Sequence, residues 1–236
     1  MAEKIIGVIG GMGPAATVEL FDRIVKNTNA RSDKEHVNMI IINDPQIPDR
    51  TEYILGRGES PIPRIIMNLK KLYRAGADTA VIPCMTAHSF ISVLQNESPI
   101  PIINAIDIIE EYLNELNPPV ERVGLLATTG TVRSKIFQEN ISKEIFVPEM
   151  NEQEILMNVI YGKNGIKAGN TSPEILDTIN KIIESLSSKR IQAIIAGCTE
   201  LSLVMNEFNI SLPLVDPILL LAKHVVKLGS PLYVSL

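Results

Sequence analysis

The only two cysteines in the chain, Cys84 and Cys198, lie in similar sequence surroundings. Each follows a run that predicts a buried strand, residues 79–82 and 191–195. Each precedes a threonine and a helical pattern, with one intervening residue in the first copy. The carboxyl end of a strand is where an open α/β sheet places its ligand, and a nearby helix N-terminus favours a thiolate. Two such thiols in one pocket could act as acid and base on opposite sides of one carbon.

Other interpretations of these cysteines compete with the catalytic one. A lone cysteine is most often a small buried hydrophobe, and two cysteines can form a disulfide. Here both cysteines occupy matching places in two similar halves, and hydroxyls flank them at Thr86 and Thr199. We therefore favour a catalytic pair, for which a disulfide would be an inactive oxidised form.

The elements that must position these residues alternate between strand and helix along the chain. This alternation is typical of an α/β fold with mainly parallel strands and right-handed crossovers. A polar stretch at residues 43–60, with two prolines and two glycines, is predicted to be a long functional loop. The predicted strands are residues 5–9, 37–42, 79–82, 100–103, 122–127, 145–147, 191–195 and 212–215, and the clearest helices are 15–27, 62–73, 175–186 and 217–228.

The pattern restarts in the second half of the chain. Gly7 to Cys84 spans 77 positions, and Gly124 to Cys198 spans 74. Both copies run strand, Gly/Thr-rich turn, helix, strand, helix, cysteine-ending strand, helix and short proline-containing strand. We therefore predict two similar α/β domains with mainly parallel sheets, related by a pseudo-twofold axis. The cysteine loops would face each other across the cleft between the domains, which would hold the active site.

Composition and charge restrict the classes of partner. The 236 residues are 45% hydrophobic and carry a net charge of -5 without a basic run, which argues against nucleic acid as a partner. No stretch approaches the roughly 18 apolar residues that span a bilayer, so no membrane partner is predicted. Residues 1–9 show no signal peptide, and two cysteines without export signals suggest a reducing compartment. We expect a cytoplasmic protein.

A glycine-rich turn, Gly10-Gly11-Met12-Gly13-Pro14, follows the first predicted strand and opens the first helix. Its glycines and Ala16 fit the dinucleotide fingerprint G-x-G-x-x-G/A. The proline stiffens the turn, however, and the next acidic candidate, Asp44, comes later than the expected ~20 positions. We favour a tight turn around Met12 whose N–H groups bind a carboxylate. A strand-to-helix turn that only requires positive φ is the alternative.

Two cations stand where a carboxylate ligand could bind. Arg50 lies in the polar loop, where on its own it would be a solvated charge, and Lys167 is bracketed by Gly165 and Gly169. Arginine would bind a carboxylate through two parallel hydrogen bonds. Thr128, in the second-half counterpart of the glycine-rich turn, is a candidate either for ligand binding or for helix capping.

His88 and Glu200 lie close to the cysteines in sequence. A Cys–His nucleophile pair is conceivable. Residues four apart on one turn, however, leave little room for a substrate, so we expect His88 to orient the loop or cap the helix. We expect Glu200 to bond backbone N–H groups at the following helix start. The three histidines lack metal-ligand spacing, and no metal site is predicted.

Taken together, these motifs resemble the aspartate/glutamate racemase family of cofactor-independent amino-acid racemases, and within it the aspartate racemase branch. The matches keep their order over nearly the whole chain. The resemblance implies domains at 1–104 with 216–236 and at 105–215, an active site between them, and a homodimer. The matching motifs are Gly10-Gly11-Met12-Gly13-Pro14, Asp49-Arg50-Thr51, Pro83-Cys84-x-Thr86-Ala87-His88, Lys167-Ala168-Gly169-Asn170 and Gly197-Cys198-Thr199-Glu200.

By position, the resemblance implies that Cys84 and Cys198 are the catalytic cysteines. Arg50 and Lys167 would then hold the substrate's side-chain carboxylate. Met85 stands where the family pattern leads us to expect asparagine, which gives the site a bulkier, apolar wall. The remaining predicted substrate-binding residues are Met12, Thr86, Ala87, Thr128, Thr199 and Glu200.

The expected reaction interconverts L- and D-aspartate, or glutamate, without a cofactor. One cysteine would be the thiolate base and the other the thiol acid, with the roles swapped for the other enantiomer. One alternative is another cysteine-dependent enzyme of the same superfamily, such as a racemase for a different acid, a decarboxylase or a cis-trans isomerase. A second alternative is an amino-acid-binding protein that has lost turnover.

Overall fold

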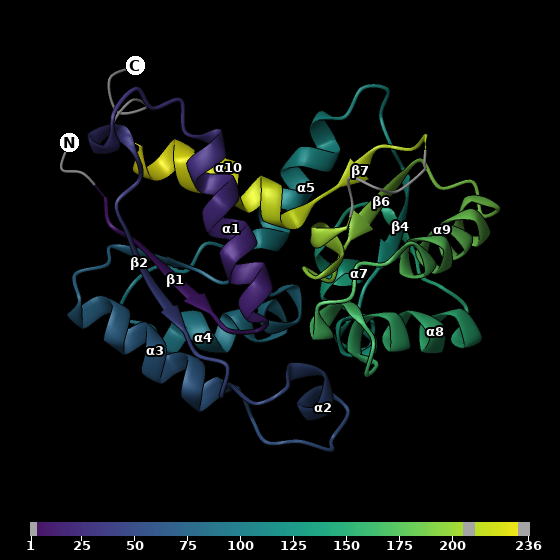
Figure 1. Ribbon diagram of the computed structural model, residues 1–236, viewed down its shortest axis with the longest axis horizontal. Helices are drawn as coiled ribbons and strands as arrows, with labels where there is room; N and C mark the ends of the chain where they lie inside the picture. Colours follow the sequence, from purple (N-terminus) through teal and green to yellow (C-terminus); the bar gives the residue numbers. More distant parts are fainter. Residues whose placement is uncertain (1–3, 205–210, 231–236) are drawn as a thin grey trace. The chain divides into compact units, whose positions relative to one another are not determined.

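The computed structural model describes residues 4–204 and 211–230 (Figure 1). The chain divides into two compact units, which we call unit 1 (Met1–Ala105 with Ile218–Leu236) and unit 2 (Ile106–Pro217). Each unit contains one sheet, and every strand pair in both sheets is parallel. The α/β class with parallel sheets that the sequence predicts is therefore confirmed.

Unit 1 is built on a three-stranded sheet in the order β2-β1-β3. The strands are β1 (Ile6–Gly10), β2 (Met39–Asn43) and β3 (Thr79–Val81). The helices are α1 (Pro14–Asn27), α2 (Arg50–Ile54), α3 (Ile62–Arg74), α4 (Ile91–Glu97) and α10 (Pro217–Gly229), with the 3-10 helices η1 (Asp33–Glu35) and η2 (Met85–Phe90).

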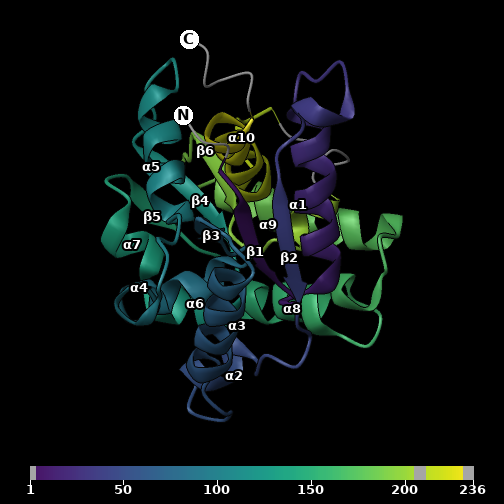
Figure 2. The ribbon, with the colours of Figure 1, turned by 90° about the vertical axis from the view of Figure 1, so that its left-hand side faces the viewer.

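Helices cover both faces of this sheet because successive strand side chains point to opposite sides. Gly7 lies so close to α3 that a Cβ there would come within 2.8 Å of Leu72 Cδ1. On the other face, a Cβ at Gly229 of α10 would lie 3.1 Å from Ile6 Cγ1. Figures 1 and 2 show α3 on one side of β1 and β2, and α1 and α10 on the other.

Unit 2 is built on a four-stranded sheet in the order β5-β4-β6-β7. Its strands are β4 (Arg122–Leu126), β5 (Glu144–Phe146), β6 (Ala193–Ala196) and β7 (Leu214–Val215). Its helices are α5 (Ala105–Glu115), α6 (Thr129–Ser134), α7 (Ile136–Asn140), α8 (Met150–Tyr161) and α9 (Pro173–Ser187), with η3 (Ile166–Ala168) and η4 (Leu201–Leu203).

Helix α9 contributes a large part of the hydrophobic core of unit 2. Pro173 occupies its first turn, where a missing N–H costs nothing, and one apolar face from Ile175 to Leu186 is buried. A Cβ at Gly124 in β4 would lie 2.8 Å from Ile191 Cδ1 and 3.5 Å from Leu186 Cδ1, so β4 and α9 are in close contact. Helix α8 packs beside α9 (Figure 1).

The two units share one strand topology. In each, the first strand is central, and the cysteine-ending strand pairs with it. Gly7 pairs with Ala80, four residues before Cys84, and Gly124 pairs with Ile194, four residues before Cys198. An isolated bridge from Ala80 to Ile102 stands where β7 pairs with β6 in the other unit. The predicted similarity of the two halves is thus confirmed down to strand register.

The local predictions differ from the structure at several elements. The predicted strand at residues 100–103 is reduced to the single bridge at Ile102. Helix α2 lies within the predicted loop, and α5 and α8 were not predicted. A 3-10 helix, η2, rather than an α-helix, follows Cys84 directly. A helix was also predicted after Cys198; the chain forms η4 there, and residues 205–210 lie outside the described residues.

No helix within residues 4–204 and 211–230 combines the length and the apolar character that a membrane-crossing segment needs.

Asp44, just after β2, ties the long loop of unit 1 to α3. Its carboxylate accepts two hydrogen bonds from Arg64, at 2.8 and 2.9 Å, and one from Asn68 Nδ2 at 2.8 Å. The Gln46 N–H donates to the same carboxylate at 3.1 Å. The hydrogen bonds from Arg64, helped by Asn68, hold the pKa of Asp44 well below its ordinary value although burial opposes them. This carboxylate therefore fixes the start of the loop.

We expect Asp44→Ala to lower the free energy of unfolding at neutral pH by about 1–3 kcal/mol, because it removes charged hydrogen bonds and leaves the buried Asn68 amide without its acceptor. The pKa of Asp44 is lower folded than unfolded, so its contribution is present above the unfolded-state pKa and is lost as pH falls towards the folded-state pKa. Urea unfolding of both proteins should show a difference that shrinks below about pH 4.

The matched control is Glu52→Gln, which breaks an exposed pair with Arg57 and should change stability much less. Equal effects of the two substitutions, or a difference that grows on acidification, would contradict this role of Asp44.

Candidate active site

The predicted site residues of unit 1 follow the carboxyl ends of its three strands. Gly10 at the end of β1 pairs with Asn43 at the end of β2, and Val8 pairs with Val81 at the end of β3. The glycine-rich turn, the loop after β2 and the Cys84 segment therefore leave the sheet at one edge, where open α/β sheets bind ligands.

Arg50 is a buried cation that joins the long loop to the glycine-rich turn. Its side chain is buried, with Nη1 donating to the carbonyls of Ile47 at 3.3 Å and Pro48 at 3.1 Å. Nη2 donates to the Met12 carbonyl at 3.3 Å. Asp49 fixes the start of α2 by accepting a hydrogen bond from the Glu52 N–H at 2.9 Å. A solvated loop charge, the interpretation that its sequence setting alone favours, is therefore wrong for Arg50.

Cys84 is buried, only 5% exposed, between β3 and η2. The His88 ring lies over the same turn, with Nδ1 3.0 Å from the Cys84 carbonyl oxygen. Because a carbonyl only accepts, Nδ1 carries the proton in this contact. His88 thus orients the cysteine loop through its backbone, as expected. The three residues after Cys84, which are Met85, Thr86 and Ala87, are all buried.

The second cysteine lies in a polar trio with Glu200 and Lys167. The Cys198 thiol donates to Glu200 Oε2 at 3.1 Å, and Glu200 Oε1 forms an ion pair with Lys167 Nζ. Lys167 extends from η3, and its ammonium also lies 5.2 Å from the centre of the Tyr161 ring. The carboxylate oxygens of Glu200 thus bind side chains, Cys198 and Lys167 among them, rather than only the backbone N–H groups that the sequence suggested.

Burial and charge set the protonation states of this trio. Burial raises the pKa of the Cys198 thiol well above its ordinary value, and the negative charge of Glu200 raises it further, while Lys167 opposes both. Burial also raises the pKa of Glu200, but the Lys167 ammonium together with the hydrogen bonds that the carboxylate accepts leaves that pKa below its ordinary value. Unit 2 therefore holds a neutral thiol beside an ionised carboxylate.

Thr128 caps the helix that follows β4. Its Oγ1 accepts a hydrogen bond from the Thr131 N–H at 3.3 Å and lies 3.1 Å from the Thr131 hydroxyl. Capping, one of the two roles considered for Thr128, is thus present in the structure. Thr199 is buried beside the trio, with Oγ1 donating to Glu200 Oε2 at 3.4 Å.

The predicted residues form two sets, each with one cysteine and one cation. Within the described residues, Cys, His, Asp and Glu side chains form no group of three or more that could hold a metal ion. The set in unit 1 comprises Met12, Arg50, Cys84, Met85, Thr86 and Ala87, and the set in unit 2 comprises Thr128, Lys167, Cys198, Thr199 and Glu200.

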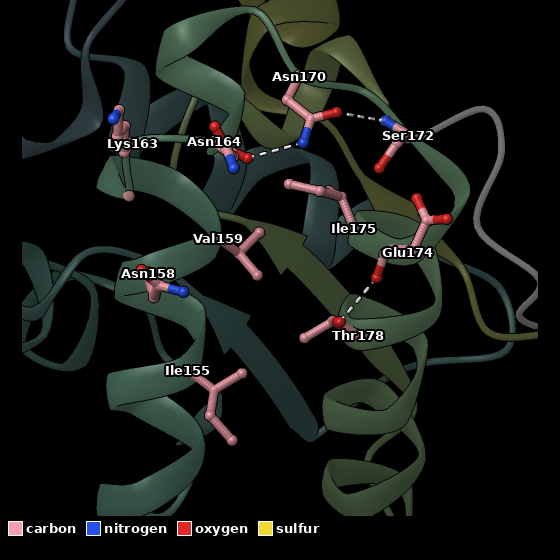
Figure 3. Close-up of a pocket in the computed structure, with 11 residues that line it drawn as sticks. Ile155, Asn158, Val159, Lys163, Asn164, Asn170, Ser172, Glu174, Ile175 and Thr178 are labelled. Atoms are coloured by element: carbon pink, nitrogen blue, oxygen red, sulfur yellow. Dashed lines mark hydrogen bonds between the residues drawn. The ribbon is translucent and has the colours of Figure 1, made fainter.

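A separate cavity of about 470 Å³ opens between α8 and α9 (Figure 3). It is lined by amides and hydroxyls together with Ile155, Val159 and Ile175, and by none of the predicted site residues. Asn170 spans its upper wall in the figure, donating to the Asn164 carbonyl at 2.7 Å and accepting from the Ser172 N–H at 3.0 Å. These bonds brace the segment that carries Lys167.

Comparison with known proteins identifies the family. The sequence matches the Asp/Glu/Hydantoin racemase family over residues 9–225. The chain belongs to this family. It is also 26% identical over 231 residues to the broad specificity amino-acid racemase RacX of Bacillus subtilis (strain 168), an alignment that covers 94% of this chain and 96% of RacX.

Solved structures agree with this assignment. The Picrophilus torridus aspartate racemase shares 31% identity and a TM-score of 0.82, covering 95% of this chain and 93% of its own. A Francisella tularensis glutamate racemase, solved in complex with D-glutamate, shares the fold at 18% identity and a TM-score of 0.69, covering 96% and 81%. The predicted resemblance is confirmed, and the protein is an isomerase of the amino-acid racemase type.

The glycine-rich turn of this racemase has no room for a side chain at Gly11. Gly11 has φ +94°, its N–H donates to Thr17 Oγ1 at 3.0 Å, and a Cβ would collide with the Asp44 backbone. Gly76 has a similar φ of +97°, but a Cβ there would meet nothing within 4 Å. Substituting alanine at each glycine therefore distinguishes the cost of the positive φ, which both positions share, from the cost of steric collision, which only Gly11 has.

We expect Gly76→Ala to cost about 1–2 kcal/mol of unfolding free energy, the usual penalty for positive φ. Gly11→Ala should cost at least about 1–3 kcal/mol more, because the colliding atoms belong to the backbone and cannot rotate away. Chemical denaturation measures both. Similar losses in the two variants would show that the turn can shift to accept a methyl group.

Proposed function

We propose that the protein racemises an acidic amino acid, with aspartate as the first candidate and glutamate as the second. Cys84 and Cys198 transfer the α-proton, and the reaction uses no cofactor. The two sets of site residues face one substrate in a cleft between the domains. Assembly as a homodimer and a cytoplasmic location stay predictions from the resemblance and the sequence.

The observation that carries this proposal is the equivalence of the two cysteines. Each lies four residues after the strand position that pairs with the glycine of the central strand, Gly7 or Gly124. Both thiols are buried and free of any disulfide. Inverting a carbon centre requires a base on one face and an acid on the other. A duplicated fold that carries one thiol in each copy supplies two such groups.

The proton transfers balance without another reactant. One cysteine thiolate forms an S–H bond as the Cα–H bond breaks, and the electron pair remains on Cα. The other cysteine then gives its S–H proton to the opposite face and becomes the thiolate. Charge that develops on the substrate's α-carboxylate would be stabilised by N–H groups of the turn at Met12 and by the Thr199 segment.

Two cations support an acidic substrate. Arg50 is held rigidly by three carbonyl oxygens, and Lys167 by Glu200. A rigid guanidinium binds a carboxylate at low entropic cost. The match to an aspartate racemase at 31% identity favours aspartate. The match to a broad specificity racemase makes a wider substrate range the alternative to test.

The first test measures α-proton exchange of L-aspartate and L-glutamate by proton NMR in deuterated buffer, with chiral chromatography of the products. We expect one acid to lose its α-proton signal while the D-enantiomer appears. Cys84→Ser and Cys198→Ser should each reduce racemisation by roughly 10²–10⁴-fold or more, since a serine hydroxyl is a far weaker acid than a thiol.

A panel of neutral and basic amino acids serves as the control for substrate range. Racemisation of these at rates equal to aspartate would replace the acidic specificity with a broad one. Full activity of either cysteine variant would rule out the two-thiol mechanism.

Arg50→Lys tests the substrate cation. Lysine keeps the charge but loses the planar fork, so we expect KM for the acidic substrate to rise roughly 10–100-fold, the equivalent of one charged hydrogen bond. Arg57→Lys, in the same loop but exposed and paired with Glu52, is the matched control and should leave KM unchanged. Steady-state kinetics of both variants decide; an unaltered KM in Arg50→Lys would remove Arg50 from the substrate site.

A further inference from the structure

Glu200 is a buried carboxylate placed between the two functional groups of unit 2. It is 3% exposed. Oε2 accepts a hydrogen bond from the Cys198 thiol at 3.1 Å, and Oε1 binds the Lys167 ammonium. A thiol that donates to a carboxylate must carry its proton. One side chain thus fixes both the protonation of the cysteine and the position of the cation.

The two halves of the fold differ at this point. The residue two positions after Cys198 is Glu200, whereas the residue two positions after Cys84 is Thr86. The Cys84 loop is instead oriented by His88, which contacts the backbone carbonyl of Cys84. The two cysteines therefore occupy equivalent positions in the two sheets, but the side chains next to them differ in charge.

We propose that Glu200 is a positioning residue that sets the direction of the first proton transfer. It holds Cys198 as the resting thiol, and so makes Cys198 the acid and Cys84 the base. This inference rests on the proposed two-cysteine function. In the first turnover the Cα–H bond breaks as Cys84 gains the proton, and Cys198 then protonates the opposite face. The Cys198 thiolate that results lies beside ionised Glu200, and Lys167 offsets part of the repulsion.

The charges that act on Cys198 within unit 2 support this order. Apart from burial, Glu200 raises the pKa of the thiol and Lys167 lowers it. Replacing Glu200 with glutamine removes the first effect and leaves the second. The thiolate should then form at lower pH, next to an ammonium that has lost its ion pair with residue 200.

A single-thiol titration tests the inference without any turnover. The parent protein is Cys84→Ser, in which Cys198 is the only thiol. The ultraviolet absorbance of the thiolate is followed against pH, and the absorbance of Cys84→Ser/Cys198→Ser is subtracted to remove the contribution of tyrosine ionisation. We expect Glu200→Gln in this parent to lower the pKa of Cys198 by at least about one unit, a tenfold change in the thiol–thiolate equilibrium. Coincident titration curves would overturn the inference.

Two further variants make the comparison specific. Glu149→Gln breaks another Lys–Glu pair of unit 2, with Lys189 at 2.5 Å, and should leave the Cys198 titration unchanged. Glu200→Asp keeps the negative charge, so the pKa of Cys198 should stay higher than in Glu200→Gln. If the glutamine variant does not fold, the aspartate variant still allows the titration. A shift with Glu149→Gln as large as with Glu200→Gln, or an aspartate variant that titrates like glutamine, would count against Glu200.

Kinetics with both cysteines present give a second readout. The two enantiomers have equal free energies, so kcat/KM must be equal in the two directions in every variant, whereas kcat can differ between directions. We expect Glu200→Gln to change the ratio of L-to-D and D-to-L kcat by several fold. An unchanged ratio would leave Glu200 a structural residue only. The racemisation assay of the two cysteine variants tests the proposed enzyme function. The thiol titration tests the role of Glu200 and needs no racemase activity.

Discussion

Parallel strand pairing is the constraint on which both units depend. Strands that run in one direction place all their carboxyl ends at one edge of a sheet, and the loops that leave this edge converge. In unit 1 this edge gathers the glycine-rich turn, the Arg50 loop and Cys84; in unit 2 it gathers the Thr128 turn and Cys198. Each helix-covered sheet thus serves as a rigid base for residues far apart in the sequence.

Side chains then make the two similar backbones chemically different. In unit 1, Arg50 is held by backbone carbonyls, and the cysteine turn by a histidine ring. In unit 2 one carboxylate holds both the cation and the thiol. A duplicated fold starts with equivalent positions, and substitutions at a few of them are enough to surround the two cysteines with different side chains.

The sequence predicted what depends on local pattern and could not predict what depends on distant contacts. Apolar runs ended at the cysteines, so both cysteine-ending strands were found, each to within about two residues. Helix α8 was missed because few of its side chains are buried, which leaves a weak apolar period. Arg50 looked like a solvated charge because its three carbonyl partners belong to a folded loop and turn. The Lys167–Glu200 pair joins residues 33 positions apart, and no spacing rule indicates it.

The return of α10 to unit 1 has a consequence for synthesis on the ribosome. Unit 2 is one continuous stretch, whereas unit 1 is interrupted by it. Ile6, at the start of β1, packs against Gly229 near the end of α10, so the part of the sheet face that α10 covers stays exposed until unit 2 has been synthesised. The second unit to be synthesised can therefore be the first to complete its core, which reverses the usual vectorial order of folding.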